Sequence, residues 1–423
     1  MVSIHKVQDG KIQSVLMRIL HLCDSLNPAG LGGYESYLHY LSREMSRHGH
    51  ESFIVTQASS RESLPRENRD AYEIWTLPGN YLEARKWEFL ALTETERSSQ
   101  VSKLFTDDDL EENVRALCTQ LSKVIQKLQP DIIHAHSTYI VFNRVLQSLL
   151  HTGALGDIAM VATIHGLSKS LILPGGANTT DYEQLAEFCP FDRILAVSET
   201  VAMALRDLLK NRGKDDCVQR LYIGIDLDVF KPEPNIEKKW DIAFLGRLEP
   251  MKGVDIFPEM LKLLQVSHPS LKMVLTGEGS LKQSMLQDLD TYEVANLVEY
   301  LGVIAAEVVP HVINASRIFL YPSRREPFGL SVLEGMACEV PVITANVYGP
   351  SEVVTHEQDG YLITPGNPRI LADAVDRLLT DSELYDRIRR NSRATAERFD
   401  IKLHVPRLLE IYAELQDTTH RLS

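Results

Sequence analysis

The chain has 423 residues, of which 44% are hydrophobic and 24% charged, and its formal net charge is −14. This length exceeds one ordinary hydrophobic core and predicts two domains, while the acidic balance argues against a nucleic-acid-binding protein. The five cysteines are odd in number, widely spaced and without a CxxC pair. That usage argues against a zinc site or a disulfide framework and favours a reducing compartment.

The sequence carries no sign of membrane insertion. No apolar run is long enough to cross a bilayer, and the stretch from Met1 to Lys6 lacks the apolar segment of a signal peptide. We therefore expect a cytoplasmic protein. Peripheral contact with the inner face of the membrane stays open, because attachment through a surface helix leaves little trace in bulk composition.

Short apolar stretches alternate with segments of helical periodicity along the whole chain, as where Leu38, Leu41 and Met45 share one helical stripe. Near-continuous apolar strands between helices indicate parallel sheets that are covered on both faces. In the first half the predicted strands are residues 15–23, 52–56, 131–135, 161–164, 193–197 and 220–223. In the second half they are residues 241–245, 271–275, 298–301, 317–321 and 341–344.

The polar, proline-bearing segment 231–239 is the best linker candidate, because a strand begins directly after it at Trp240. We therefore predict two doubly wound α/β domains, residues 1–232 and 233–400. Any ligand should bind in the crevice at the carboxyl ends of the strands. Residues 60–114 look irregular and charged, and we interpret them as an insertion or lid in the first domain.

The most informative stretch runs from Glu326 to Gly335. It places Glu326 and Glu334 eight positions apart, around a Pro-Phe-Gly turn and the start of a helix. Unpaired amides at a helix N-terminus bind phosphate, and carboxylates accept hydrogen bonds from sugar hydroxyls. The combination indicates a ligand that is part phosphate and part polyol, which is the description of a nucleotide-sugar.

A glycine-rich turn follows the first predicted strand and contains Gly30, Gly32 and Gly33. Glycines there let the backbone approach a phosphate closely. The dinucleotide fingerprint G-x-G-x-x-G is incomplete, because Glu35 occupies the third glycine position and no acidic residue follows the second strand. An NAD-dependent oxidoreductase is therefore a weaker alternative. The other alternative is a purely structural strand–helix turn that binds no ligand.

Two cations, Arg247 and Lys252, lie five residues apart in the loop that follows the first strand of the second domain. Arginine can hold phosphate oxygens in a bidentate manner, and lysine adds a point charge. Together they can neutralise a departing diphosphate without a metal ion. An isolated pair of this kind is usually a solvated surface, but the position after a strand favours function.

His165 follows a buried strand of the first domain and precedes Gly166. Its imidazole can bind a sugar hydroxyl or a phosphate, or take part in proton transfer, although a structural role is commoner for any single histidine. His134 and His136 end another strand and are weaker candidates. In the second domain, the glycine turns around Gly277 and before Val303 suit recognition of a nucleotide base by the backbone.

Taken together, these motifs resemble glycosyltransferase family 4 (glycosyl transferases group 1), a retaining group with the GT-B fold of two Rossmann-like domains facing across a cleft. The E-x7-E run with Pro-Phe-Gly inside it, downstream of Gly246-Arg247 and Lys252-Gly253, is the most specific part. The resemblance covers most of the chain, through residues 32–35, 165–166, 196–199, 224–226, 246–253, 277–279, 326–334, 349–352 and 359–360.

The resemblance implies a role for each matching residue. Arg247 and Lys252 would hold the donor diphosphate, and Glu326 would bind hydroxyls of the transferred sugar. His165 would lie near that sugar and the reacting centre. The remaining donor-binding residues would be Glu334 on the ribose hydroxyls, the amides of Phe328, Gly329, Leu330 and Ser331 on donor oxygens, Gly32 and Gly33 on the diphosphate from the first domain, and Gly277 and Val303.

The resemblance also implies the reaction. A nucleotide-diphosphate sugar, UDP- or GDP-linked, would donate to a hydroxyl of a small-molecule, glycan or lipid-linked acceptor, with no cofactor and no metal ion. The path would be front-face and oxocarbenium-like, without the protein nucleophile of a retaining glycosidase. The segment 401–423 would form a helix that crosses back to the first domain. The alternative is a function that is not enzymatic. The chain would then be a catalytically silent nucleotide-sugar-binding partner in a glycan-assembly complex.

Overall fold

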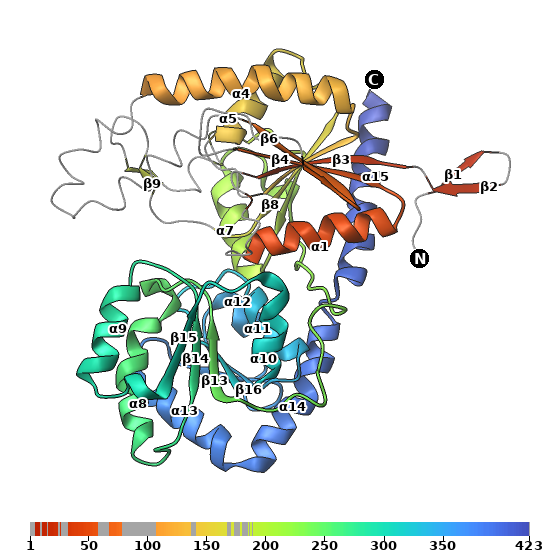
Figure 1. Cartoon of the computed structure of the whole chain (residues 1–423). Helices are drawn as coiled ribbons and strands as arrows, with labels where there is room; N and C mark the ends of the chain where they lie inside the picture. Colours follow the sequence, from red (N-terminus) through yellow and green to blue (C-terminus); the bar gives the residue numbers. More distant parts are fainter. Residues whose placement is uncertain are drawn as a thin grey trace. The chain divides into compact units, whose positions relative to one another are not determined.

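The computed structural model describes residues 5–8, 11–14, 16–23, 26, 33–57, 67–77, 107–136, 141–166, 171–172, 178–179, 185, 187 and 189–422 (Figure 1). The chain divides into two compact units. Unit 1 comprises Met1–Leu26, Leu41–Leu221 and Val405–Ser423, and unit 2 comprises Asn27–Tyr40 and Tyr222–His404. No helix in the described part of the chain is both long enough and apolar enough to span a membrane.

Unit 1 is built on an eight-stranded sheet with the order β12-β11-β8-β7-β3-β4-β6-β5. Its neighbouring strands are parallel except at one edge, where β5 runs antiparallel to β6. The strands are β3 (Arg18–Cys23), β4 (Glu51–Gln57), β5 (Glu67–Arg69), β6 (Tyr72–Leu77), β7 (Ile132–His136), β8 (Ala159–Ile164), β11 (Arg193–Ala196) and β12 (Val218–Arg220). Two separate hairpins are formed by β1 (His5–Gln8) with β2 (Lys11–Ser14) and by β9 (Leu171–Ile172) with β10 (Asn178–Thr179).

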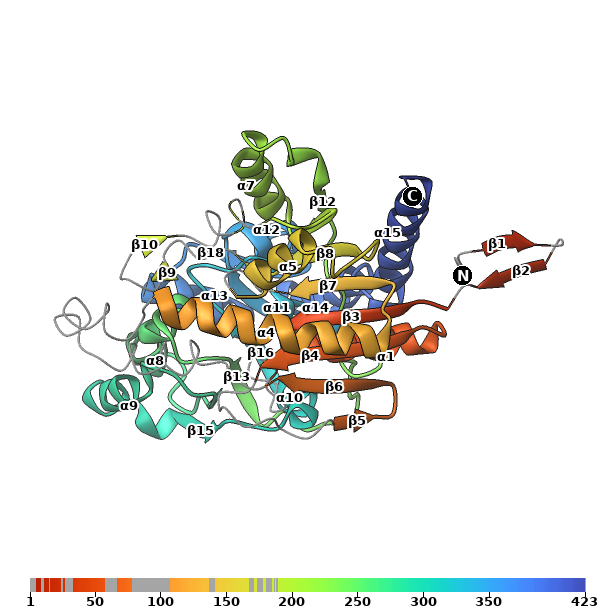
Figure 2. The ribbon, with the colours of Figure 1, turned by 90° about the horizontal axis from the view of Figure 1, so that it is seen from above.

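The two faces of this sheet carry different side chains because successive residues of a strand point to opposite sides. On one face Leu20, Ile133 and Met160 join the apolar core formed with the helices α4 (Asp107–Leu128), α5 (Val141–His151) and α7 (Glu199–Lys210). Figure 2 shows α4 lying along this sheet. The other face carries His21 and His134, and there α15 (Ile401–Leu422) contributes Tyr412.

Unit 2 is built on a six-stranded parallel sheet with the order β15-β14-β13-β16-β17-β18. The strands are β13 (Trp240–Leu245), β14 (Met273–Thr276), β15 (Val298–Gly302), β16 (Ser316–Tyr321), β17 (Val342–Ala345) and β18 (Tyr361–Ile363). The helices are α8 (Phe257–Gln265), α9 (Lys282–Thr291), α10 (Val309–Asn314), α11 (Leu330–Ala337), α12 (Tyr348–Val353), α13 (Pro368–Thr380) and α14 (Ser382–Glu397).

Helices cover both faces of this second sheet (Figure 1). Ile318 and Leu320 of β16 belong to the apolar core that α8, α9 and α13 close on one side. The intervening Phe319 points to the opposite side, where α11 approaches so closely that a Cβ added at Gly335 would lie 2.7 Å from the Phe319 ring. The pattern of two covered faces explains why the strand sequences are almost continuously apolar.

All the strands predicted from the sequence overlap observed ones, and the α/β class with two parallel sheets is confirmed. The description of residues 60–114 as irregular was wrong for its described parts. Glu67–Arg69 and Tyr72–Leu77 are strands of the sheet, and Asp107 begins the helix α4. Every residue of the charged edge strand β5 is exposed, so this strand lacks the apolar pattern that marks a buried strand.

Candidate functional site

The loops that follow β13 and β16 are brought together by the topology of unit 2. From β13 the chain moves outward to β14 and β15, and then returns to place β16 on the other side of β13. Ligands of open α/β sheets bind at the carboxyl ends of the strands where the order reverses in this way. The Arg247–Lys252 loop follows β13 and the Glu326 loop follows β16, so both predicted motifs lie at this switch point.

At this edge three polar side chains form a buried network. The Lys252 ammonium donates to Glu326 Oε2 at 2.8 Å and also to the Tyr321 hydroxyl. The Tyr321 hydroxyl donates to the same Glu326 oxygen at 2.9 Å. The side chains of Lys252 and Glu326 are each only 13% exposed. The structure therefore joins two residues that the sequence analysis had placed in separate motifs.

Backbone packing holds these two loops in register. Gly253, directly after Lys252, has a left-handed backbone with φ +73°, and a Cβ there would lie 2.5 Å from the carbonyl oxygen of Pro322. The amide of Arg324 donates to the carbonyl of Met251 at 2.8 Å. Only glycine permits such a conformation and such an approach without strain, which gives the Lys-Gly pair of the motif a structural reason.

The network fixes the charge of the site. Burial by itself would lower the pKa of Lys252, but the Tyr321 and Glu326 oxygens outweigh that effect and raise this pKa above its usual value. Burial, together with the Glu326 charge, raises the pKa of Tyr321 to about 12. Lys252 therefore stays a cation, and Tyr321 stays a neutral hydroxyl, throughout the physiological pH range.

Both ends of the ion pair retain hydrogen-bonding capacity. A lysine ammonium has three N–H donors, and Tyr321 and Glu326 use two of them. Both protein hydrogen bonds to the carboxylate go to Oε2, and Oε1 accepts none from the described residues. One donor and one carboxylate oxygen thus remain available to a ligand at the switch point.

Arg247 belongs to the same loop as Lys252 and is exposed, and no described carboxylate forms an ion pair with it. The backbone around it is held by a second glycine loop, because Leu248 N donates to the Glu278 carbonyl at 2.9 Å. Gly277 has φ +114°, and a Cβ there would lie 1.9 Å from the Gly246 carbonyl oxygen. Gly277 thus allows the loops after β13 and β14 to touch. Val303, beyond β15, is 42% exposed.

The Pro-Phe-Gly turn leads directly into the helix α11. Gly329 has φ +101°, and its carbonyl accepts the first helical hydrogen bond, from Val332 N at 3.0 Å. The amides of Leu330 and Ser331 precede that bond and therefore have no acceptor within the helix. Phe328 is buried, and a Cβ added at Gly349 would lie 2.3 Å from its Cα, so the turn is closely packed.

Glu334 lies one turn into α11 and is half-buried. Desolvation raises the pKa of its carboxyl group to about 7, and a hydrogen bond from Ser331 opposes that shift only in part. A carboxylate that titrates near neutral pH in a site of this kind is a functional candidate. Its ability to accept hydrogen bonds as an anion should therefore change within the physiological pH range.

In unit 1 the structure places His165 just beyond β8, half-buried, with its Nε2 atom 3.1 Å from Nδ1 of His136. Gly33, which belongs to unit 2, is the exposed first residue of α1 (Gly33–Arg47). Gly32 lies outside the described residues. The structure therefore groups Arg247, Lys252, Glu326, Gly277 and the α11 residues within unit 2, and His165 within unit 1.

Three buried histidines of unit 1, His21, His134 and His136, could geometrically hold a metal ion. Hydrogen bonds already engage both ring nitrogens of His134, with Tyr412 and Thr163, and both of His136, with His165 and His21. A metal ion would have to displace these bonds. We therefore treat the group as a hydrogen-bonded cluster.

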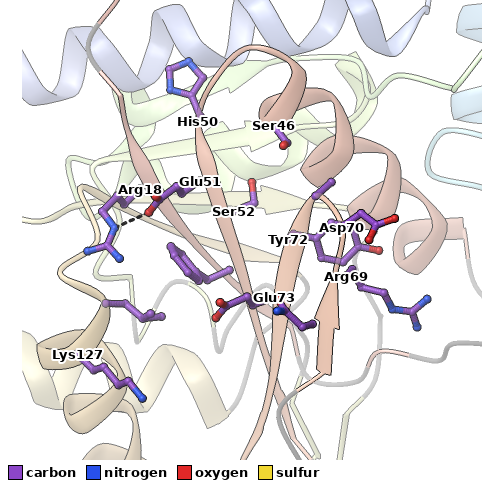
Figure 3. Close-up of a pocket in the computed structure, with 14 residues that line it drawn as sticks. Arg18, Ser46, His50, Glu51, Ser52, Arg69, Asp70, Tyr72, Glu73 and Lys127 are labelled. Carbon is purple, nitrogen blue, oxygen red and sulfur yellow. Dashed lines mark hydrogen bonds and ion pairs between the residues drawn. The ribbon is translucent and has the colours of Figure 1, made fainter.

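A shallow pocket of about 450 Å³ lies elsewhere in unit 1, at the amino ends of β3, β4 and β6 (Figure 3). Two of its cations already have partners, since Arg18 bonds Glu51 at 2.8 Å and Lys127 lies 5.0 Å from the Trp75 ring centre. The pocket lies at the amino ends of the strands, whereas ligands of this architecture bind at the carboxyl ends. The pocket therefore adds nothing to the candidate site.

Tyr321 is the residue that the sequence analysis missed. It is the last residue of β16 and looked like part of an apolar strand. Other matching motif residues have structural contacts: Ser198 caps α7, Asp359 bonds Thr355 and Thr395, and a Cβ at Gly224 would lie 2.7 Å from the Cα of Ile401. These contacts within the fold explain why these residues occur at the positions that match the family.

Two parallel-sheet α/β units, with loops of this composition at the carboxyl edge, define the GT-B class of glycosyltransferase. The chain belongs to glycosyltransferase family 4. The family described as Glycosyltransferase Family 4 matches residues 31–229, and the one described as Glycosyl transferases group 1 matches residues 227–395. This membership removes the reason for the oxidoreductase alternative.

Individual proteins agree with that assignment. The N-acetyl-alpha-D-glucosaminyl L-malate synthase of Bacillus anthracis is 27% identical over 310 residues, which cover 71% of this chain and 79% of that protein. The sucrose-phosphate synthase structure from Thermosynechococcus elongatus matches with a TM-score of 0.72 at 18% identity, over 95% of this chain and all of that one. Anabaena HepE in complex with UDP and glucose matches with a TM-score of 0.66 at 20% identity, over 94% of this chain and all of that one.

Proposed function

We propose that this glycosyltransferase is a retaining enzyme that transfers a sugar from a UDP- or GDP-linked donor to an acceptor hydroxyl without a metal ion. The observation that carries the proposal is the Lys252–Tyr321–Glu326 network at the switch point of unit 2. It offers a fixed positive charge and an accepting carboxylate oxygen side by side. A donor molecule with a diphosphate next to a sugar needs both.

The phosphate end of the donor would be held by Lys252, Arg247 and the first amides of α11. The third N–H of Lys252 would bind a diphosphate oxygen, and the exposed Arg247 guanidinium would add a second charge. The free amides of Leu330 and Ser331 would bind further oxygens. Fixed charges of this kind stabilise a leaving group as negative charge develops on it, and they can replace a metal ion in that role.

The sugar end would be held by Glu326, whose Oε1 atom would accept hydrogen bonds from the transferred sugar. Its Oε2 atom already accepts from Lys252 and Tyr321. A carboxylate neutralised in this way is a weak nucleophile, which favours a front-face path in which the leaving phosphate helps to deprotonate the acceptor. His165 would lie near the transferred sugar, Glu334 would accept from the ribose, and Gly33 and Val303 would complete the donor site.

The acceptor would be a small molecule, a glycan or a lipid-linked sugar. The net charge of −14 favours a soluble acceptor over an anionic membrane surface. The malate synthase relative is named for joining a sugar to a small soluble acid, which supports beginning an acceptor screen with small molecules. HepE was solved with UDP and glucose, which supports beginning the donor panel with UDP-sugars.

The test is hydrolysis of a panel of UDP- and GDP-sugars, followed by an acceptor screen with the chosen donor, each with and without EDTA. We expect turnover of a single donor class, an unchanged rate in EDTA, and a product whose anomeric configuration by NMR equals that of the donor. Loss of activity in EDTA would contradict metal independence, and an inverted product would contradict retention. Tight nucleotide binding without any turnover would favour the silent partner.

A further inference from the structure

A row of three histidines runs through unit 1 and ends at His165. His21 Nδ1 lies 3.2 Å from His136 Nε2, and His136 Nδ1 lies 3.1 Å from His165 Nε2. His21 and His136 are completely buried, and His165 is half-buried. Each contact between neighbouring histidines therefore joins one defined nitrogen of each ring.

Strand register produces this row. β7 lies between β3 and β8 in the sheet, and His136 pairs with Cys23 on one side and with Thr163 on the other. His165 follows two residues after Thr163, beyond the end of β8. His136 is further confined by the ring of His134, 4.0 Å away between ring centres, which is itself bonded to Tyr412 and Thr163.

The row has a preferred direction of hydrogen bonding. Burial lowers the pKa of His21 to about 3, so this ring is neutral and carries one proton. Its Nε2 atom is buried and has no hydrogen-bond partner among the described residues. A buried N–H without an acceptor is rarer and costlier than an unused acceptor. The proton therefore belongs on Nδ1, from which it donates to His136 Nε2.

The remaining proton positions follow from that one. If His136 accepts at Nε2, its own proton lies on Nδ1 and donates to Nε2 of His165. A neutral His165 must then carry its proton on Nδ1, because each neutral imidazole has one donor and one acceptor nitrogen. A reversed row would end in a buried N–H at His21 without an acceptor among the described residues.

We propose that His136 is a positioning residue for His165, fixing its ring orientation and holding it in the Nδ1–H tautomer, with His21 setting the direction of the row. This proposal depends on the proposed function in one respect, which is the role of His165 at the transferred sugar. A misplaced or wrongly protonated ring would disturb alignment in the transition state more than binding of the donor. We therefore expect loss of this positioning to lower kcat more than it changes the donor KM.

The first test reads the tautomer directly and needs no substrate. Protein with 15N-labelled histidine rings is examined by two-bond 1H–15N correlation, and the His165 signal is assigned from its loss in His165→Asn. We expect the Nδ1–H pattern in the native protein and a mixture of tautomers in His136→Ala. In Tyr412→Phe, which removes a bond to His134 but leaves the row intact, we expect the native pattern.

The second test is kinetic. His136→Ala should lower kcat about 10- to 100-fold while the donor KM changes less than about threefold. His136→Asn should recover most of the loss, because its side-chain amide can donate near the position of Nδ1. Tyr412→Phe should retain the native kcat. Thermal melting of each variant separates these effects from loss of the folded protein.

The outcomes distinguish the two proposals. An Nε2–H pattern for His165 in the native protein, or the same tautomer in His136→Ala as in the native protein, would overturn the positioning role. If the tautomer behaves as expected but neither His165→Asn nor His136→Ala lowers kcat, the positioning role stands and the proposed role of His165 fails. Equal loss of kcat in His136→Asn and His136→Ala, with a native tautomer in both, would also overturn the proposal.

Discussion

Lys252 and Glu326 are 74 positions apart in the sequence, and their charged groups are 2.8 Å apart in the structure. Each side chain is 13% exposed. Taking two charges out of water costs more than their attraction returns unless further hydrogen bonds satisfy them, and here the Tyr321 hydroxyl bonds both. A buried pair held in this way at a sheet edge is better explained by ligand binding than by stability.

Lys252→Gln tests the positive charge of this pair. Because the charge acts on the leaving diphosphate, we expect kcat to fall about 10²- to 10³-fold, with a much smaller change in the KM of an uncharged acceptor. Steady-state kinetics with both substrates varied would show this. Lys262→Gln is the control, since Lys262 is an exposed lysine of α8 paired with Glu293 at 3.4 Å. Unchanged turnover in Lys252→Gln would contradict the role.

Tyr321→Phe tests the third member of the network. The ring is retained, but Lys252 and Glu326 each lose a charge-assisted hydrogen bond, so we expect kcat/KM for the donor to fall about tenfold or more. Tyr385→Phe is the matched control, because its hydroxyl donates to the Arg317 carbonyl at 3.1 Å. That control should lose stability without any kinetic change. Equal kinetics in the two variants would remove Tyr321 from the site.

Glu334→Gln tests ribose binding and its dependence on pH. We expect the donor KM to rise about tenfold, because a charged acceptor becomes neutral. Since the pKa of this carboxyl group is about 7, the donor KM of the native enzyme should rise as the pH falls from 8 to 6. The variant should lack that slope. Glu339→Gln, whose carboxylate pairs with Arg389 at 3.2 Å, should keep the native KM, and a pH-independent KM in the native enzyme would contradict the assignment.

The same carboxyl group should be visible in stability. Its folded pKa of about 7 exceeds the ordinary value near 4.5, so the folded state binds this proton more tightly than the unfolded state. The associated stabilisation is present below about pH 4.5 and is lost as the pH rises through 7. The melting temperature of Glu334→Gln minus that of the native protein should therefore be more positive at pH 8 than at pH 5. A difference independent of pH would refute this.

Gly277→Ala tests the contact between the loops after β13 and β14. A Cβ 1.9 Å from the Gly246 carbonyl oxygen forces the backbone to move, so we expect the free energy of unfolding to fall by roughly 3 kcal/mol or more. Gly302→Ala is the matched control. It also has a positive φ, +66°, but nothing lies within 4 Å of its added Cβ, so it should cost only about 1 kcal/mol. Similar costs in denaturant titrations would contradict the close contact.

Much of the fold could be predicted from the sequence because the buried parallel strands are long apolar runs. The strands missed were those without that signal. Every residue of β5 is exposed, β6 mixes buried and half-buried residues within a charged segment, and β18 has only three residues, of which one is buried. Tyr321 was missed for a related reason, because a tyrosine at the end of an apolar strand gives no sign of what its hydroxyl contacts.

The sequence by itself determined the family, the two-sheet architecture and the residues at the loops after β13 and β16, because the spacing of glycines and charges within each loop is local information. Only the tertiary structure decided which of these residues meet. Strand order placed β16 beside β13 and so joined Lys252 to Glu326 and Tyr321. Strand register likewise aligned His21, His136 and His165. Such contacts depend on how distant strands pair, and no local pattern of residues records that.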